Sequence, residues 1–255
     1  MTEPARIVSL VPSLTELVFW LGAGDRLVGR TRFCEEPAGQ VERVPIVGGT
    51  KNPKVQRIVD LRPDLVLANK EENRREDIEA LQAAGLDVLL TDPNTVAEAV
   101  AMVEQLGALL GAEEPARQLA AATREELAPP LRGLADKGLG GEAPRVFVAI
   151  WWNPLMGLGS ASYGHDLLSR AGAVNVLAAR ERYPEVSLEE VAALSPDLVL
   201  LPDEPFPFTS RQTPAFEAIA SVRLIDGKLL WWYGPRMPSA IRQLRQLLSE
   251  VSRPA

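Results

Sequence analysis

Short, wholly apolar stretches of the chain alternate with longer stretches whose apolar residues recur at helical spacing. The short stretches predict buried strands at residues 6–11, 65–68, 88–90, 146–150, 198–201 and 229–232. Continuous apolar character, as opposed to strict alternation, is typical of parallel strands that are covered on both faces. Helices between such strands indicate an α/β fold.

Several of the predicted helices begin at recognisable capping sequences. Three pairs place a hydroxyl residue three positions before a glutamate, the spacing of a capping box: Ser13 and Glu16, Thr95 and Glu98, and Ser187 and Glu190. Asn52 followed by Pro53 favours another helix start. Trp20 lies on the apolar stripe of the helix that follows the first strand, so its ring is expected to be buried.

The chain repeats one pattern of helix, turn and strand. Residues 56–68 and 189–201 each read as a helix, a Pro-Asp turn and a buried strand. Residues 14–28 and 165–177 form a second matched pair in the same order. The repetition predicts two lobes of similar build.

The segment between the two lobes has a different composition. Pro115 opens a helical pattern, and the segment then contains Pro129, Pro130, Gly138, Gly140 and Gly141. We therefore predict an N-terminal lobe at 1–112, a connecting helix and linker at 113–141, and a C-terminal lobe at 142–255.

Composition and charge exclude several classes of function. The 255 residues carry a formal net charge of -7 without a basic patch, which argues against nucleic acid as a partner. Cys34 and His165 are the sole cysteine and histidine, so a disulfide within the chain is impossible and a zinc site is not expected. The first residues lack the pattern of a secretory signal. This predicts a cytoplasmic location, or an extracytoplasmic one if a signal has been removed.

The chain resembles the helical-backbone metal receptor family. The resemblance lies in four segments that follow one another in a characteristic order, at 6–17, 57–67, 77–85 and 187–200. Members of this family are class III periplasmic substrate-binding proteins for cobalamin, iron-siderophores or haem, and the resemblance is to the cobalamin-binding branch. It implies two Rossmann-like lobes with mainly parallel sheets, a long connecting helix and a ligand cleft between the lobes. It also implies a monomer that binds a corrinoid, haem or a ferric siderophore, without catalysis or an intrinsic cofactor, and that delivers it to an ABC permease.

Aromatic residues at strand ends are the first candidates for ligand contacts. Trp152, Trp232 and Tyr233 are expected to face the ligand, because successive side chains on a strand point to opposite sides and one ring of each pair should be buried. The resemblance adds further ligand-binding candidates, which are Arg32, Phe33, Gly49, Tyr183 and Arg236. Val47 departs from the pattern, since cobalamin binders tend to carry a tryptophan in that loop.

Two other motifs have weaker functional interpretations. The glycine-rich segment 157–164 begins too far beyond its strand to form a dinucleotide-binding turn. His165 could be an axial ligand to cobalt or iron, but a histidine at a helix start is more often a surface residue, and no metal site is assigned.

The alternative function is a cytoplasmic protein that binds or processes a corrinoid or tetrapyrrole in the same cleft. Such an enzyme would need facing titratable groups, which the sequence does not indicate.

The resemblance also implies a surface glutamate on each lobe that contacts arginines of the permease. The second-lobe position corresponds to Glu189, with Glu190 beside it, whereas the first-lobe position holds Gln56, with Lys54 nearby. A missing charge should weaken docking. The missing charge and the predicted cytoplasmic location together favour a protein that docks weakly onto a permease, or a cytoplasmic binder that has no permease partner.

Overall fold

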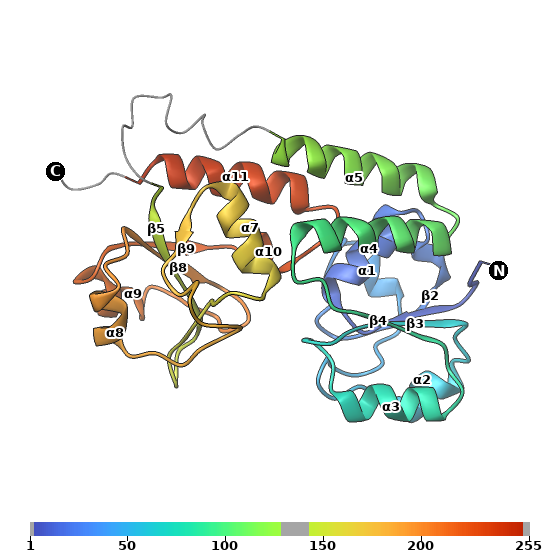
Figure 1. Cartoon of the computed structure of the whole chain (residues 1–255). Coiled ribbons are helices and arrows are strands. Elements are labelled where there is room, and N and C mark those ends of the chain that lie inside the picture. The colour runs from blue at the N-terminus through green and yellow to red at the C-terminus, as the bar shows by residue number, and fades with distance from the viewer. Residues whose placement is uncertain (1–2, 129–142, 252–255) are drawn as a thin grey trace. The chain divides into compact units, whose positions relative to one another are not determined.

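The computed structural model describes residues 3–128 and 143–251 (Figure 1). The chain divides into two compact units. Unit 1 contains residues 1–93, 99–121 and 233–235, and unit 2 contains 94–98, 122–232 and 236–255. The prolines and glycines predicted to end the connecting segment, at 129–141, lie outside the described residues.

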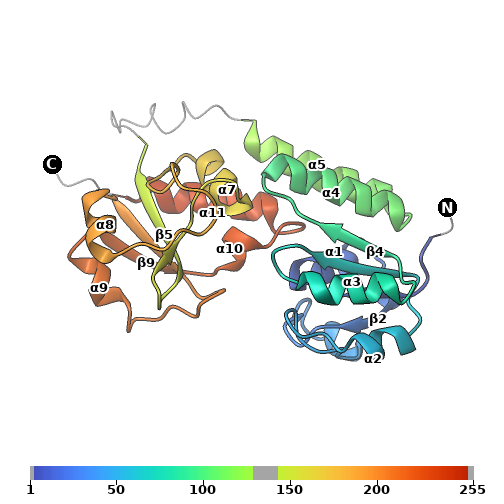
Figure 2. The same cartoon turned by 60° about the horizontal axis from the view of Figure 1, so that its bottom comes forward.

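Unit 1 is built on a four-stranded parallel sheet with the order β2-β1-β3-β4. Its strands are β1 (Ile7–Ser9), β2 (Leu27–Arg30), β3 (Leu65–Asn69) and β4 (Val88–Thr91). Its helices are α1 (Pro12–Trp20), α2 (Val55–Asp60) and α3 (Arg75–Ala83), and most of α4 (Val96–Leu109) and α5 (Glu113–Leu127). Helices α2 and α3 cover one face of the sheet, and α1 and α4 cover the other (Figures 1 and 2).

Unit 2 is also built on a mainly parallel sheet. Strands β7, β5, β8 and β9 lie side by side and parallel, and the short β6 pairs antiparallel with β5. The strands are β5 (Arg145–Trp151), β6 (Met156–Gly157), β7 (Val174–Asn175), β8 (Leu198–Pro202) and β9 (Ser221–Ile225). The helices are α7 (Tyr163–Ala171), α8 (Leu188–Ala193), α9 (Thr213–Glu217), α10 (Lys228–Trp231) and α11 (Met237–Ser249).

A shared motif at the start of the first strand supports this internal repeat. In unit 1, the carboxylate of Asp64 accepts hydrogen bonds from the backbone N–H of Ala5 and Arg6, both at 2.9 Å. The guanidinium of Arg6 donates to the carbonyl of Leu61 at the end of α2. These bonds satisfy a carbonyl that the helix leaves without an intrahelical partner.

Unit 2 makes the same set of bonds. Asp197 accepts from the N–H of Arg145 at 2.7 Å, and the Arg145 guanidinium donates to the carbonyls of Leu194 and Ser195. The left-handed residue before the Pro-Asp turn is also matched, with φ of 47° at both Arg62 and Ser195. The two predicted helix–turn–strand segments are therefore equivalent in structure as well as in sequence.

Some predicted elements are wrong in detail. Residues 229–232 are not a strand, because the carbonyl and carboxylate of Asp226 accept from the N–H groups of Leu229 and Lys228 and start helix α10. Helix α1 begins at Pro12 and has no capping bond from Ser13, and α2 begins two residues after Pro53. Trp20 is 43% exposed, so it is not a core residue.

The capping box at Ser187 is confirmed. Its hydroxyl accepts from the N–H of Glu190 at 3.2 Å, and the Glu190 carboxylate accepts from the N–H of Ser187 at 2.8 Å. Thr95 likewise accepts from the N–H of Glu98 at 3.1 Å. These bonds lie within one helical turn, so the local sequence is enough to specify them.

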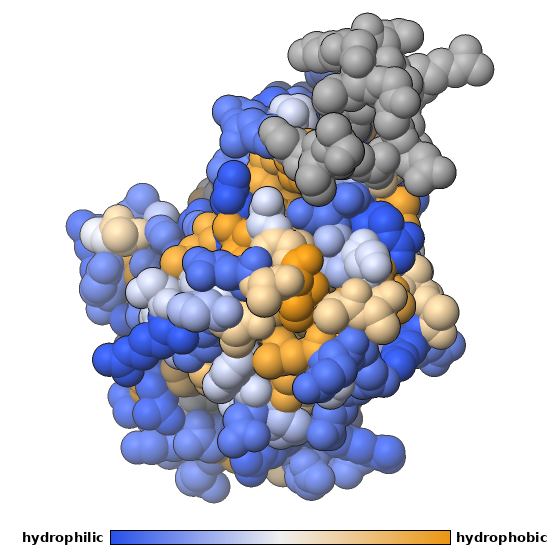
Figure 3. Space-filling view, turned by 90° about the vertical axis from the view of Figure 1, so that its left-hand side faces the viewer, coloured by the Kyte–Doolittle hydropathy of each residue, from blue (hydrophilic) through white to orange (hydrophobic). Residues whose placement is uncertain are grey.

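Figure 3 views the molecule from the side of unit 2, where apolar side chains gather in the middle of a largely polar face. The exposed large apolar side chains of unit 2 include Trp151, Val174 and Leu224. In the part of the chain that the structure describes, none of the helices combines the length and apolar character needed to cross a membrane.

Candidate ligand-binding surfaces

Both sheets have one edge at which a ligand site is expected. In open parallel sheets, ligands bind beyond the carboxyl ends of the strands, at the point where the strand order changes direction. The strand order places this point between β1 and β3 in unit 1, and between β5 and β8 in unit 2. We describe the side chains at each of these edges in turn.

In unit 1, the loop after β3 is held by a buried asparagine. The side-chain N–H of Asn69 donates to the carbonyl of Thr91 at 3.0 Å. Its side-chain oxygen accepts from the N–H groups of Glu71 and Glu72, at 2.9 and 3.2 Å. The backbone of the two glutamates is therefore held at the end of the strand.

A second asparagine joins this loop to the rest of the edge. The side-chain oxygen of Asn73 accepts from the N–H of Asn69 at 2.9 Å. Its N–H group donates to the carbonyls of Leu10 and Thr50, at 3.3 and 3.0 Å. Because all of these groups are satisfied, the carboxyl ends of β1 and β3 form a rigid polar platform.

Tyr233 lies at this platform. Its ring is 7% exposed, and its hydroxyl contacts the side chains of Ser13 and Thr91. Burial, reinforced by the negative charge of Glu72, raises the pKa of Tyr233 far above its ordinary value, so the phenol is neutral. The structure thus places Tyr233 at the expected edge, while its role as a ligand contact remains a prediction.

Three other predicted residues lie together in the loops after β2. The guanidinium of Arg32 lies 5.5 Å from the ring centroid of Phe33 and donates to the side chain of Asn52 at 3.3 Å. A Cβ atom on Gly49 would lie 2.4 Å from the Asn52 side-chain oxygen and 3.1 Å from Arg32 Nη2. A larger residue here would therefore have to push these two side chains aside. Phe33 is 52% exposed, so its ring is accessible to a ligand.

Arg30 holds these loops in place, and the sequence analysis did not identify it. This buried side chain donates to the carbonyls of Val41 and Val44 through Nε, at 2.9 and 3.1 Å. Through Nη1 it donates to the carbonyls of Thr31 and Cys34, at 3.2 and 2.9 Å. The fork of the guanidinium thus fastens both ends of the loop that carries Arg32 and Phe33.

The corresponding edge of unit 2 is aromatic. Trp151, at the end of β5, meets Phe206, in the loop after β8, with ring centroids 5.4 Å apart in an edge-to-face arrangement. Trp151 is 41% exposed. The loop is held by Trp231, whose indole N–H donates to the carbonyl of Glu204 at 2.7 Å. We call this pair of rings, Trp151 and Phe206, the aromatic ledge.

The predicted orientation of the neighbouring tryptophans is reversed. Trp152 is partly buried and packs edge-to-face on Phe208 and Phe216 of the unit 2 core, with centroids 6.5 and 5.9 Å away. One ring of the pair packs on the core as predicted, but β5 ends at Trp151, and Trp151 is the more exposed ring. Composition alone could not decide which face of β5 the core covers.

Trp232 is buried and is flanked by two cations. Lys228 Nζ and the guanidinium of Arg236 each lie 5.1 Å from its ring centroid. A ligand that stacked on this ring would have to displace one of the cations. Tyr183 is partly buried in the loop before α8. A role as ligand contact stays a prediction for Trp232, Arg236 and Tyr183.

The hydrogen bonds of His165 disfavour it as an axial ligand. Its Nδ1 lies 3.0 Å from the side-chain nitrogen of Asn175. That amide is oriented by two backbone bonds at 2.9 Å, one donated to Leu158 and one accepted from Leu177. Nδ1 is therefore the acceptor, which leaves the proton on Nε2 and no free lone pair there for a metal. Among the described residues, no group of three histidine, cysteine or carboxylate side chains could hold a metal.

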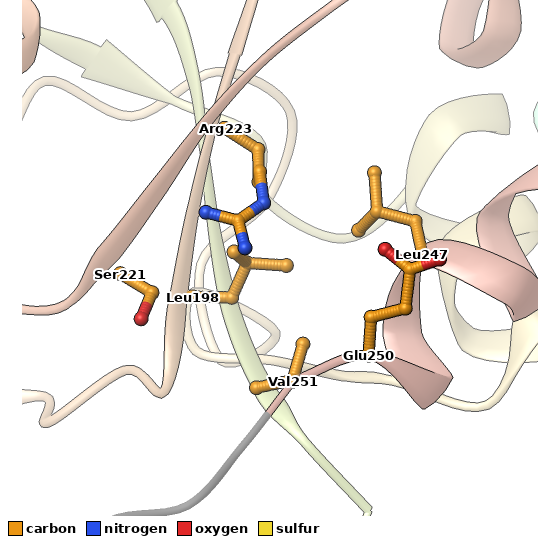
Figure 4. Close-up of a pocket in the computed structure, with 6 residues that line it drawn as sticks. All are labelled: Leu198, Ser221, Arg223, Leu247, Glu250 and Val251. Carbon is orange, nitrogen blue, oxygen red and sulfur yellow. The ribbon is translucent and has the colours of Figure 1, made fainter.

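A small pocket in unit 2 lies at the opposite edge of its sheet. It has a volume of about 160 Å³ and is lined by Leu198, Ser221, Arg223, Leu247, Glu250 and Val251 (Figure 4). Leu198 and Ser221 begin β8 and β9, so the pocket is at the amino ends of the strands. Sites for small-molecule ligands are typically about 300 Å³ or larger. We do not assign the ligand to this pocket.

Comparison with known proteins decides the family. The periplasmic binding protein model matches residues 7–224. The chain belongs to the periplasmic binding protein family. The vitamin B12-binding protein of Salmonella typhimurium is 31% identical over 77% of this chain and 71% of its own length. The uncharacterized ABC transporter substrate-binding lipoprotein YvrC of Bacillus subtilis is 28% identical over 96% of this chain and 80% of its length.

A solved structure supports the same assignment. A periplasmic heme binding protein from Pseudomonas aeruginosa aligns with a TM-score of 0.84 and 25% identity, covering 99% of this chain and 95% of that one. The predicted family resemblance and the α/β fold with two mainly parallel sheets are confirmed. The named relatives of this periplasmic binding protein are solute-binding proteins, in agreement with a binding function.

The predicted cytoplasmic location is wrong. The relatives include a lipoprotein and periplasmic binding proteins, which act outside the cytoplasm. An extracytoplasmic location, the predicted alternative, is what the family supports, and the alternative of a cytoplasmic corrinoid-binding or corrinoid-processing protein is not supported. Residue patterns within the folded part of a periplasmic binding protein are those of any globular domain, so they did not reveal the compartment.

The structure distinguishes the two glutamates predicted to dock onto a permease. Glu190 is engaged in the capping box and pairs with Arg180 at 2.9 Å, and these contacts hold its pKa below the ordinary value. Glu189 is exposed in the first turn of α8, and backbone and Ser187 hydrogen bonds likewise lower its pKa. At the equivalent position of α2, the exposed Gln56 donates to Asp60 at 2.9 Å.

Proposed function

We propose that this periplasmic binding protein captures cobalamin or another corrinoid for an ABC transporter, with haem as the second candidate ligand. The observation that carries the proposal is the aromatic ledge at the carboxyl-end edge of unit 2. Two adjoining rings, one of them 41% exposed, offer a rigid apolar surface to the flat face of a macrocycle. Relatives that bind vitamin B12 or heme support this class of ligand.

Unit 1 supports the proposal with a second exposed ring. Phe33 projects beside Arg32 from a loop that Arg30 fastens at both ends. Rigid side chains lose little conformational entropy when a ligand binds, so more of the contact energy becomes affinity. We therefore propose Trp151 and Phe206 as the apolar contacts that unit 2 offers, and Phe33 and Arg32 as an apolar and a polar contact that unit 1 offers.

Binding can be tested by tryptophan emission and thermal unfolding. Cyanocobalamin should quench emission, because Trp151 would lie against the corrin. At a ligand concentration of about 100 Kd, binding adds about 2.7 kcal/mol of stability. For a chain of this size the Tm should then rise by roughly 5–10 °C. Hemin and ferrichrome are titrated in parallel. If none of the three changes emission or Tm, the proposed class of ligand is wrong.

We further propose that Glu189 is the residue of unit 2 that contacts the permease. Both side chains are exposed, but the Glu190 carboxylate already pairs with Arg180 and accepts from the N–H of Ser187. A charge at the rim of an interface acts mainly on the association rate, through attraction before contact. Gln56 lacks such a charge, so the α2 surface of unit 1 should contribute less.

Three variants separate docking from folding. Glu189→Gln should slow association with a purified cobalamin-type ABC permease by about threefold to tenfold at low salt, and Gln56→Glu should speed it. Glu190→Gln should leave the association rate nearly unchanged and lower the Tm. Because the pKa of Glu190 is lowered in the folded protein, this stabilisation is fully present above the ordinary glutamate pKa and is lost as the pH falls through the lowered one. Equal rates for wild type and Glu189→Gln would contradict the assignment.

A further inference from the structure

The single histidine of the chain is held by a buried asparagine. His165 is partly buried near the start of α7, and its Nδ1 accepts from the side-chain amide of Asn175 at 3.0 Å. Asn175 is 3% exposed, and it also donates to the carbonyl of Leu158 and accepts from the N–H of Leu177, both at 2.9 Å. These two backbone bonds fix the orientation of the amide, because turning it over would place oxygen against oxygen and N–H against N–H.

The arrangement fits a neutral imidazole and does not fit a charged one. Both hydrogens of the Asn175 amide nitrogen are used, one by Leu158 and one by His165. An imidazolium ion carries a proton on each ring nitrogen, so its Nδ1 would present a second donor to the amide. Protonation therefore breaks this contact and leaves a buried amide hydrogen without an acceptor, which is unfavourable.

The asparagine joins two segments of unit 2. Asn175 ends β7, and its bond to the carbonyl of Leu158 fastens it to the segment between β6 and α7. The same segment supports the loop that carries Tyr183, since the N–H of Gly157 donates to the carbonyl of Pro184 at 3.0 Å. A change at the histidine can therefore reach the loop of a predicted ligand contact through residues of unit 2 alone.

The charged groups around α7 are engaged elsewhere or lie on neighbouring segments. On α7 itself, the carboxylate of Asp166 pairs with Arg170 at 2.7 Å and accepts from the N–H of Val96 at 2.8 Å. The other charged side chains on the helices that pack against α7, and on the segment after β7, are Lys228, Arg242, Arg245, Arg180, Glu181 and Arg182. Among the described residues, Asn175 is the hydrogen-bond partner of the imidazole, so a neutral amide decides which form of the ring fits.

We propose that His165 and Asn175 form a pH-sensitive latch within unit 2. The latch is closed while the ring is neutral. Below about pH 6.5, where a histidine ordinarily gains its second proton, the two donors oppose each other and the segment between β6 and α7 is released. The inference goes beyond the proposed function and holds whichever ligand binds. A protein outside the cytoplasm is exposed to the pH of its surroundings, so the latch would respond to that pH directly.

Thermal unfolding of the free protein at about pH 7.5 and about pH 5.5 tests the latch. His165→Gln keeps an oxygen that can accept from Asn175 and removes the titrating ring. The stabilisation by the latch is present above the range in which histidine titrates and is lost as the pH falls through it. The Tm of the wild type should therefore fall by roughly 2–4 °C more than that of His165→Gln. Equal falls would overturn the proposal.

A control at the next residue separates the ring from the neighbouring carboxylate. Asp166→Asn should keep the wild-type dependence of the Tm on pH, because an ordinary aspartate stays charged over this range. If Asp166→Asn abolishes the dependence, the effect belongs to that carboxylate and the latch is wrong.

Asn175→Asp gives a second test with the opposite sign. A carboxylate accepts from the Nδ1–H of an imidazolium, so protonation of the ring should now stabilise the protein. Relative to the double variant Asn175→Asp with His165→Gln, the Tm of Asn175→Asp should rise as the pH is lowered from about 7.5 to about 5.5. A fall would show that the side chain at position 175 does not set the response. If Asn175→Asp does not fold, nitrogen-15 spectra of the wild-type imidazole decide, since a proton on Nδ1 at about pH 7.5 would contradict the latch.

Discussion

Replacing Trp152 with alanine is expected to lower the free energy of unfolding by about 3 kcal/mol, the lower end of the range for a core tryptophan. The ring packs on Phe208 and Phe216 in the core of unit 2, so truncation leaves a cavity. Replacing Trp151 should leave stability nearly unchanged, because its ring is 41% exposed. It should instead weaken cyanocobalamin binding by about 1–3 kcal/mol.

These two variants are adjacent in sequence and identical in chemistry, so each is the control for the other. Denaturant unfolding of the free protein measures stability, and isothermal titration with cyanocobalamin measures affinity. The structure requires the large stability loss in Trp152→Ala and the large affinity loss in Trp151→Ala. The opposite pattern would mean that Trp151 packs on the core and that Trp152 faces the ligand.

Replacing Arg30 with methionine is expected to destabilise the protein by about 3 kcal/mol or more. The guanidinium donates to the carbonyls of Thr31, Cys34, Val41 and Val44, and a thioether donates to none of them. A buried acceptor that loses its partner costs about 1–3 kcal/mol. Because the same bonds hold the loop with Phe33, ligand affinity should fall as well.

Two variants test the geometry behind this effect. Arg30→Lys keeps the charge but not the planar fork of donors, so it should recover only part of the lost stability. Arg32→Met removes the neighbouring exposed arginine and should change stability little. Chemical denaturation of the three variants gives the comparison. An unfolding free energy for Arg30→Met equal to that of the wild type would show that the loop does not depend on this side chain.

The sequence by itself determined those features that depend on neighbouring residues. The Ser187–Glu190 capping box forms because both partners lie within one helical turn. The segments 65–68 and 198–201 form β3 and β8 because continuous apolar residues after a Pro-Asp turn suit strands covered on both faces. The same order of such segments in each half predicted two similar parallel sheets, as the structure has them.

Arg32, Phe33 and Gly49 were predicted as ligand contacts through the family resemblance, and this role stays a prediction. The structure brings these residues together after β2, with the side chains of Asn52 and Arg32 close to Gly49. Tyr233 was predicted to follow a strand at 229–232, and that strand was wrong, since helix α10 precedes Tyr233. It reaches the carboxyl-end edge of unit 1 because the chain returns there from far along the sequence.

Only the tertiary structure decided which side of an element faces the core. The pattern Trp151-Trp152 is the same whichever ring is buried, and the choice depends on Phe208 and Phe216, which arrive from later parts of the chain. The sequence likewise does not indicate that Arg30 is buried. An arginine is normally exposed, and this one is buried because several backbone carbonyls converge on it. Capping and strand formation depend on neighbours in the sequence, whereas burial and loop anchoring depend on residues that folding brings together.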